Sequence, residues 1–167
     1  MKLFHVSENP CIEKFIPRYS ARIDKSIVWA ISEPKLVNYL LPRDCPRICF
    51  STGDRSLPSD CHRLLGSSEQ VIAIESNWYE RAIETSLYLY EMPCETFTLF
   101  DSIAGYYVSQ LEVVPTRLNV IKQPVKEIVS RNVELRILPT LWQLHDDVVN
   151  STLNFSVIRM KHARPRI

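Results

Sequence analysis

Glycine is scarce in this 167-residue chain, which has three glycines against eleven prolines. The three, Gly53, Gly66 and Gly105, lie far apart in the sequence. Phosphate-binding loops of the P-loop and dinucleotide-binding types need clustered glycines, because their backbone amides must approach the phosphate closely. The chain cannot build such a loop, so any nucleotide site in it has to be made from side chains.

Short apolar and β-branched runs between turn residues predict about seven or eight strands and three to five helices. The helices are expected over residues 33–41, 60–65, 77–84, 124–132 and 140–155, the last extending as far as Met160. Because the strands do not alternate regularly with long helices, we expect an α+β fold. Its mixed, mostly antiparallel sheet would be flanked by the helices. The strand-like or extended segments from which these strands are drawn cover residues 2–6, 27–32, 47–52, 70–76, 86–93, 96–100, 105–109, 112–121 and 133–138.

The chain shows no linker or internal repeat, so we expect one globular domain over residues 1–160 and a loose, basic C-terminal tail over residues 161–167. The net charge is +1, from 20 lysines and arginines against 19 acidic residues, and does not favour a nucleic-acid or membrane surface. No apolar run approaches the ~20 residues that span a bilayer, and the N-terminus does not resemble a signal peptide. We therefore expect a cytoplasmic protein, of undetermined oligomeric state.

The five cysteines are expected to be reduced, because their number is odd and no signal peptide precedes them. Cys45, Cys49, Cys61 and His62 are the best candidates for a zinc site. Their spacing lacks the C-x2-C or H-x3-5-H pair that one element can present to a tetrahedral ion. We expect no metal.

His5 is the leading candidate for a site residue, within the segment LFHVSE. In a strand its side chain shares one face with those of Leu3 and Ser7. One interpretation is a core histidine bonded to a backbone carbonyl, since buried polar groups are normally paired. The other is a site residue, because neutral imidazole offers one donor and one acceptor to a sugar hydroxyl and can act as a general base.

Arginines that follow prolines are the next candidates. Arg18 and Arg43 lie in stretches of restricted backbone, which lowers the entropic cost of presenting a guanidinium to a phosphate or carboxylate. For Arg43 the alternative is an ion-pair cluster with Asp44 and Arg47 at the end of the helix.

Two tyrosines and a glutamate complete the set. Tyr39 ends the helix that follows strand 27–32, and Tyr107 lies in an extended segment; either ring would stack on a flat heterocycle or pack in the core. Glu112 opens the predicted strand 112–121, where its carboxylate could accept hydrogen bonds from a ribose or a nucleophile. The alternative for Glu112 is a solvated surface residue.

Segments spread over essentially the whole chain resemble an uncharacterised family of small bacterial proteins, a domain of unknown function. The resemblance lies in LFHVSE, VWAISE, NYLLPRDCPR, AGYYVS and STLNFSVIRMKHA. That family has no assigned reaction, so this resemblance implies no activity.

A second resemblance is to the ADP-ribosyltransferase superfamily, which includes the RNA 2′-phosphotransferases. It lies in a motif L-[FY]-H-x-[ST], a strand and helix of the type V-[YW]-A followed by A-x-x-Y, and a late segment Y-x-S-x-x-x-V-x-P. Leu36 replaces the alanine of A-x-x-Y. The matching residues are Leu3, Phe4, His5, Ser7, Val28, Trp29, Ala30, Tyr39, Tyr107, Ser109, Val113 and Pro115.

The second resemblance implies a ligand cleft in which His5 holds the ribose of NAD and Tyr39 stacks on nicotinamide. A glutamate, Glu112 or its competitor Glu91, would help to activate the acceptor. The implied protein is an ADP-ribosyl- or phosphotransferase-like enzyme with NAD as a substrate. The ribosyl centre would be stabilised electrostatically as nicotinamide leaves.

The residues taken to contact the nucleotide are Ser7, Arg18, Tyr39, Arg43 and Tyr107, beside the catalytic pair His5 and Glu112. Two alternatives stay open at this point. One is a non-catalytic module that binds a small anion or a protein partner. The other is a small hydrolase that uses a cysteine or serine with His5, although no partner base is recognisable nearby in the sequence.

Overall fold

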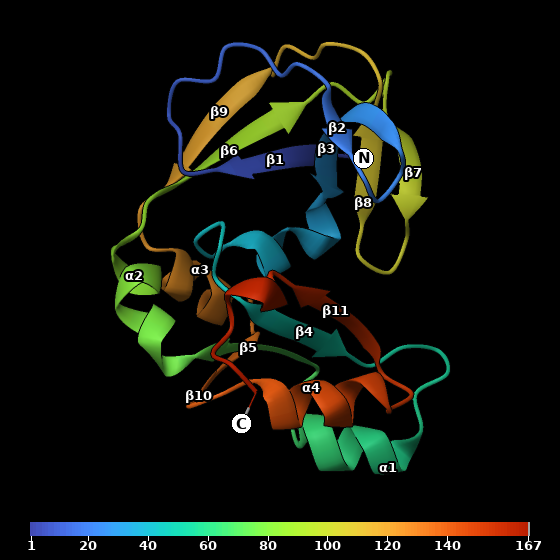
Figure 1. The fold of residues 1–167 in the computed structure, drawn as a ribbon, viewed down its shortest axis with the longest axis vertical. Coiled ribbons are helices and arrows are strands. Elements are labelled where there is room, and N and C mark those ends of the chain that lie inside the picture. Colours follow the sequence, from blue (N-terminus) through green and yellow to red (C-terminus); the bar gives the residue numbers. More distant parts are fainter. Residues whose placement is uncertain (167) are drawn as a thin grey trace. The chain divides into compact units, whose positions relative to one another are not determined.

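The computed structural model describes residues 1–166, whose strands and helices are drawn in Figure 1. The described residues form two compact units. The first consists of residues 1–39 and 86–122, and the second of residues 40–85 and those from 123 onward. The predicted α+β class and mostly antiparallel pairing are confirmed, with the strands divided between two sheets.

The first unit is built on a seven-stranded sheet with the order β7-β8-β3-β1-β6-β9, in which β2 also pairs with β3. Every neighbouring pair in this sheet is antiparallel. A 3-10 helix, Glu33–Tyr39, follows β3 where an α-helix over residues 33–41 was expected. The strands are β1 (Leu3–Ser7), β2 (Arg18–Ser20), β3 (Lys25–Ser32), β6 (Leu87–Met92), β7 (Thr98–Asp101), β8 (Tyr106–Ser109) and β9 (Arg117–Ile121).

One face of this sheet, which we call the His5 face, carries the core of the first unit. The register pairs His5 with Tyr90 and Ala30 with Tyr107, and side chains directly opposite one another share a face. Buried on or above this face are Leu3, Phe15, Val28, Ala30, Tyr90, Met92, Phe97 and Val113.

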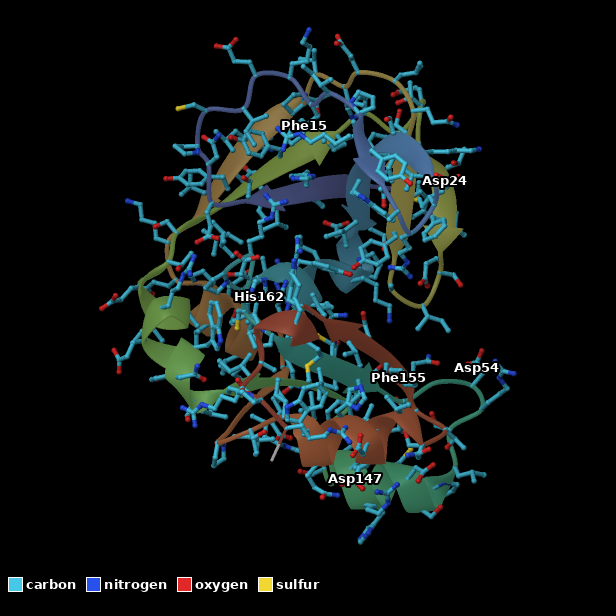
Figure 2. All side chains as sticks on the ribbon, in the orientation of Figure 1. Phe15, Asp24, Asp54, Asp147, Phe155 and His162 are labelled. Carbon is cyan, nitrogen blue, oxygen red and sulfur yellow. The ribbon has the colours of Figure 1, made fainter. Side chains whose placement is uncertain are left out.

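Two irregular segments cover the His5 face. Phe15 and Val113 exchange backbone hydrogen bonds of 2.8 and 3.0 Å, so the segments around them run side by side. Both side chains are buried, and Figure 2 labels Phe15. The face is thus partly covered by chain that belongs to neither a helix nor a long strand, and His5, Ser7 and Tyr107 on it stay partly exposed.

The second unit contains a four-stranded sheet with the order β10-β5-β4-β11. β10 is parallel to β5, and the other two pairs are antiparallel. The strands are β4 (Arg47–Ser51), β5 (Gln70–Glu75), β10 (Glu134–Leu138) and β11 (Asn154–Ile158). The helices are α1 (Pro58–Asp60), which continues as a π turn over Cys61–Leu65, then α2 (Tyr79–Glu84), α3 (Pro124–Ser130) and α4 (Trp142–Val149), with 3-10 turns at Ser76–Trp78 and Met160–His162.

Of the helix expected over residues 140–155, only the first half is confirmed, and the second half is wrong. Helix α4 ends at Val149, and Asn154–Ile158 is strand β11, which pairs with β4. The helix stops because Asn150 and Ser151 bond back to the carbonyls of Asp146 and Val148, as short polar side chains do at helix ends. The apolar side chains of Leu141, Leu144 and Val148 pack into the core with Ile48, Phe50 and Val71.

Within the predicted tail, residues 161–167, Arg164 and Arg166 form hydrogen bonds with Glu75 and with helix α4; Ile167 lies outside the described residues. The carboxylate of Glu75, a fully buried group at the end of β5, accepts hydrogen bonds from the backbone amide of Arg164 at 3.0 and 3.2 Å. It also accepts one from the amide of Leu141 at 3.4 Å. The indole of Trp142 donates to the carbonyl of Arg164 at 2.7 Å.

We predict that Glu75→Ala lowers the free energy of unfolding by about 2–4 kcal/mol, because it leaves the buried amide of Leu141 and the part-buried amide of Arg164 without an acceptor. Chemical denaturation measures this, and limited carboxypeptidase digestion should remove the C-terminal segment faster from the variant. The exposed Glu69, changed to alanine, is the control and should leave both measurements unchanged. An equal effect of the two substitutions would contradict the anchoring role of Glu75.

Candidate functional site

The imidazole of His5 is held by main chain. Its Nδ1 lies 2.9 Å from the carbonyl oxygen of Trp29 on β3. Because a carbonyl only accepts, Nδ1 is the donor in this contact. A carbonyl partner is what the core interpretation requires, yet the residue is half-buried and not fully enclosed.

Aromatic rings surround His5. The ring of Phe15 lies 4.6 Å from the imidazole between centroids, and Phe15 in turn meets the edge of Tyr90 at 5.3 Å. The hydroxyl of Tyr90 donates to the carbonyl of Asn9 at 2.7 Å and accepts from the amide of Ile12 at 3.0 Å. The segment that covers His5 is therefore tied to the sheet by polar as well as apolar contacts.

Glu112 lies on the cover of the His5 face, not in a strand, because β9 begins only at Arg117. Its carboxylate accepts a hydrogen bond of 2.9 Å from the ammonium of Lys14, and 55% of its side chain is exposed. An ion pair this exposed contributes little to stability. The competing Glu91 pairs with Phe4 in the register, so its side chain lies on the opposite face of β6 from that of His5.

Ser7 and Tyr107 share the His5 face. The hydroxyl of Ser7 accepts a hydrogen bond of 3.0 Å from the amide of Asn9. Tyr107 is half-buried on β8 and packs against the core of the first unit. Ala30 lies between His5 and Tyr107 across the sheet. It pairs directly with Tyr107 on one side, and the antiparallel register that pairs Phe4 with Ile31 places it opposite His5 on the other. Three of the predicted site residues thus lie on one surface.

Tyr39, Arg18 and Arg43 do not join that group in the first unit. Tyr39 is buried, and its ring meets the ring of Tyr106, which is on the opposite face of β8 from Tyr107, at 5.7 Å. Arg18 is exposed on the short strand β2. Arg43 belongs to the second unit, in the segment that leads into β4.

Arg47 and Asp44, the two residues predicted to form an ion-pair cluster with Arg43, bond to other groups. The buried guanidinium of Arg47 donates to the carbonyls of Pro42 at 3.1 Å and Cys45 at 3.2 Å. Asp44 lies 3.4 Å from Nε2 of His162. These contacts of Arg47 and Asp44 are with groups outside the predicted Arg43–Asp44–Arg47 cluster.

Sequence reasoning missed a cationic aromatic cluster in the first unit. The guanidinium of Arg22 lies 5.2 Å from the ring centre of Phe100 and 5.3 Å from that of Tyr106, and it forms a 3.2 Å ion pair with Asp101. Trp29 meets the edges of both rings, at 5.5 and 5.1 Å. No spacing in the sequence links Arg22 to residues 100–106. The cluster could have been predicted only with knowledge of how the strands pair.

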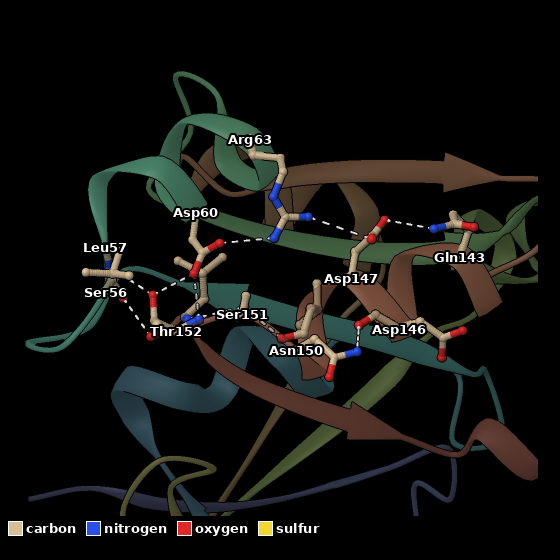
Figure 3. A network of polar contacts seen from close by, with 12 residues as sticks. Ser56, Leu57, Asp60, Arg63, Gln143, Asp146, Asp147, Asn150, Ser151 and Thr152 are labelled. Carbon is tan, nitrogen blue, oxygen red and sulfur yellow. Dashed lines mark hydrogen bonds and ion pairs between the residues drawn. The ribbon is translucent and has the colours of Figure 1, made fainter.

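A second missed group is the polar network around Asp60 in the second unit, drawn in Figure 3. The carboxylate accepts from the amide and hydroxyl of Thr152, at 2.8 and 2.7 Å, and from Arg63 at 3.0 Å. Thr152 in turn accepts from the amide of Leu57 at 2.8 Å. The network joins the loop before α1 to the turn before β11, and its bonds run between protein groups, so we interpret it as structural.

The cysteines are all free, as predicted. Cys45 is fully buried, and burial raises the pKa of its thiol to about 11, partly offset by the nearby Arg47. A thiol of this kind is protonated at neutral pH and is a poor nucleophile. Within residues 1–166, no group of three or more histidine, cysteine or acidic residues is placed to hold a metal ion, and no helix is long and apolar enough to cross a membrane.

Fold and site define an α+β protein with a histidine-bearing sheet face partly covered by two irregular segments. The model of a family of unknown function, DUF6886, matches residues 4–163, and the chain belongs to this family. The predicted resemblance to an uncharacterised family is thereby confirmed. Comparisons with curated proteins and with solved structures gave no match.

We predict that the stabilising effect of Asp60 disappears in acid. The hydrogen bonds from Thr152 and Arg63 hold the pKa of Asp60 below its usual value of 3.8, so the folded chain favours the ionised form. The contribution is complete above that usual value and is lost as the pH falls through the lowered pKa. Denaturation of the wild type and of Asp60→Asn at several pH values should show a stability difference at pH 7 that shrinks below about pH 4.

The exposed Asp54, changed to asparagine, is the matched control, because Asp54 is not among the residues that hydrogen-bond to Asp60. A difference between wild type and Asp60→Asn that stays constant down to pH 2 would contradict the role given to the ionised carboxylate.

We also predict that native protein at pH 7.5 reacts with iodoacetamide at Cys11, which is exposed, and not at Cys45. Mass spectrometry of tryptic peptides measures the sites, and denatured protein serves as the control in which both thiols react. Rapid labelling of Cys45 in the native protein would show that its thiol is accessible and activated.

Proposed function

We propose that the first unit binds a nucleotide of the NAD or ADP-ribosyl type at the His5 face. The observation that carries this proposal is the orientation of His5. Its Nδ1 lies 2.9 Å from the carbonyl oxygen of Trp29, which holds the imidazole in one orientation on the strand. An imidazole held by a rigid strand is suited to a ribose hydroxyl, because imidazole can both donate and accept a hydrogen bond.

The neighbours of His5 support a ligand of this size and character. Ser7 adds a hydroxyl on the same face, and Tyr107 adds a half-buried ring beyond the small side chain of Ala30. Hydroxyl and imidazole groups suit a sugar, while an aromatic ring suits a flat heterocycle. The scarcity of glycine agrees with a site made from side chains and not from a phosphate-binding loop.

The reaction proposed for this site is transfer of an ADP-ribosyl group. The bond between ribose and nicotinamide breaks, its electron pair leaves with nicotinamide, and an acceptor oxygen or nitrogen bonds to the ribose. Glu112 is the group proposed to take the proton of the acceptor. Its exposed carboxylate lies on the cover of the His5 face beside Lys14.

A non-catalytic nucleotide-binding module is the second candidate. It is favoured by the ion pair of Glu112 with Lys14, which neutralises the proposed base. Binding without turnover would decide for this module.

The test uses two replacements that each keep one nitrogen of the imidazole. Asparagine at position 5 places an amide near Nδ1 and keeps a donor for Trp29, whereas glutamine places its amide near Nε2. We expect His5→Asn to weaken the binding of NAD and ADP-ribose about threefold to tenfold, the loss of one hydrogen bond. His5→Gln should retain more of the affinity.

Binding is measured by calorimetry and by melting temperature, since a ligand at 100 times its dissociation constant adds about 2.7 kcal/mol of stability. Release of nicotinamide is followed in parallel, with Glu112→Gln expected to reduce release and leave binding intact. His62→Asn, at an exposed histidine of the second unit, is the control. Absence of binding to the wild type at millimolar nucleotide, or equal binding by both His5 variants and wild type, would overturn the proposal.

A further inference from the structure

Strand β9 forms an edge of the seven-stranded sheet. It pairs with β6 along its whole length, and within residues 1–166 no strand lies on its other side. The outward backbone amides and carbonyls of such a strand are a template for another extended chain. Figure 1 shows β9 next to β6, at the end of the strand order.

Two apolar side chains of this edge are open to solvent. Leu118 is 42% exposed and Val120 is 50% exposed. They pair with Tyr90 and Tyr88 in the register, so both lie on the same face of the sheet. Edge strands are commonly protected by charged residues at such positions, and β9 has apolar residues there instead.

Basic residues stand at both ends of the strand. Arg117 begins β9, and Lys122 follows its last residue. Both are exposed, and neither has a salt-bridge partner among residues 1–166; Glu91 is opposite Arg117 in the register but makes no ion pair with it. Lys122 lies in the bend directly after the strand, two residues beyond Val120.

The opposite edge of the sheet, β7, also exposes apolar side chains, Leu99 and Phe100, but it differs in its ladder and in its charges. Its pairing with β8 shifts register between Leu99 and Asp101, an irregularity that blunts an edge. The carboxylate of Asp101 is occupied by Arg22 and by the amides of Ile103 and Ala104. The continuous ladder and the unpaired cations are therefore features of β9.

We propose that β9 binds an extended peptide with apolar residues at alternate positions and an acidic residue two positions beyond them. The peptide would add a strand to the sheet by backbone hydrogen bonds, place its apolar residues beside Leu118 and Val120, and place its carboxylate at Lys122. A second copy of this chain fits less well. Antiparallel pairing of two β9 strands about Asn119 would bring Arg117 of one copy near Lys122 of the other, and like charges repel.

The probe is a fluorescein-labelled peptide of sequence ETVTVTE, whose glutamates and valines share one face in either orientation. Fluorescence polarisation measures its binding to the full chain. We expect Lys122→Glu to weaken binding about fivefold, the contribution of an exposed ion pair. Val120→Lys should weaken it about tenfold, because it removes an apolar contact and places a charge on the edge.

The control substitutions are Lys126→Glu and Val129→Lys, at exposed positions of α3 in the second unit, and the control peptide is KTVTVTK. Retention of affinity in both control variants and loss of affinity with the basic peptide would support the proposal. Equal binding by Lys122→Glu, Val120→Lys and wild type would overturn it, as would no binding of ETVTVTE by wild type. A dimer of the wild type in light scattering that Val120→Lys abolishes would also overturn it, in favour of a second copy at this edge. The outcome is independent of nucleotide binding, because it is measured without nucleotide.

Discussion

The antiparallel ladder between β1 and β6 holds the first unit together. It joins the two stretches of chain, residues 1–39 and 86–122, that make up this unit. Because β1 also pairs with β3, the first strand of the chain lies inside the sheet, and its position fixes those of its neighbours on both sides. The orientation of His5, its bond to Trp29 and the packing of Phe15 all follow from this register.

Much of the strand content could be predicted from the sequence, because alternation and β-branched runs are local properties. Residues 27–32, 47–52 and 70–76 are strands as expected, with boundaries shifted by a residue or two. Strand β11 could not be predicted in the same way. Phe155 lies seven residues after Val148, a helical spacing that favours a longer helix, and only pairing with β4 decides for a strand. The division into two sheets also depends on pairings between distant residues.

The site shows the same limit. Alternation along β1 correctly places Leu3, His5 and Ser7 on one face. It gives no information on Tyr39, because the 3-10 helix that carries this ring directs it toward Tyr106. Glu112 was expected in a strand and lies instead on a covering segment, whose path is set by the pairing of Phe15 with Val113. Residues on one strand were thus predictable as a group, and residues gathered from several elements were not.

The anchoring of the C-terminal segment uses the peptide unit and not the identity of a side chain. Glu75 accepts from the amide of residue 164, and Trp142 donates to the carbonyl of the same residue. Many residue types can present those two groups, but proline has no amide hydrogen to give. The distance along the chain from β11 to residue 164 is therefore under stricter constraint than the composition of the segment: a one-residue deletion there would shift the wrong peptide unit onto the carboxylate.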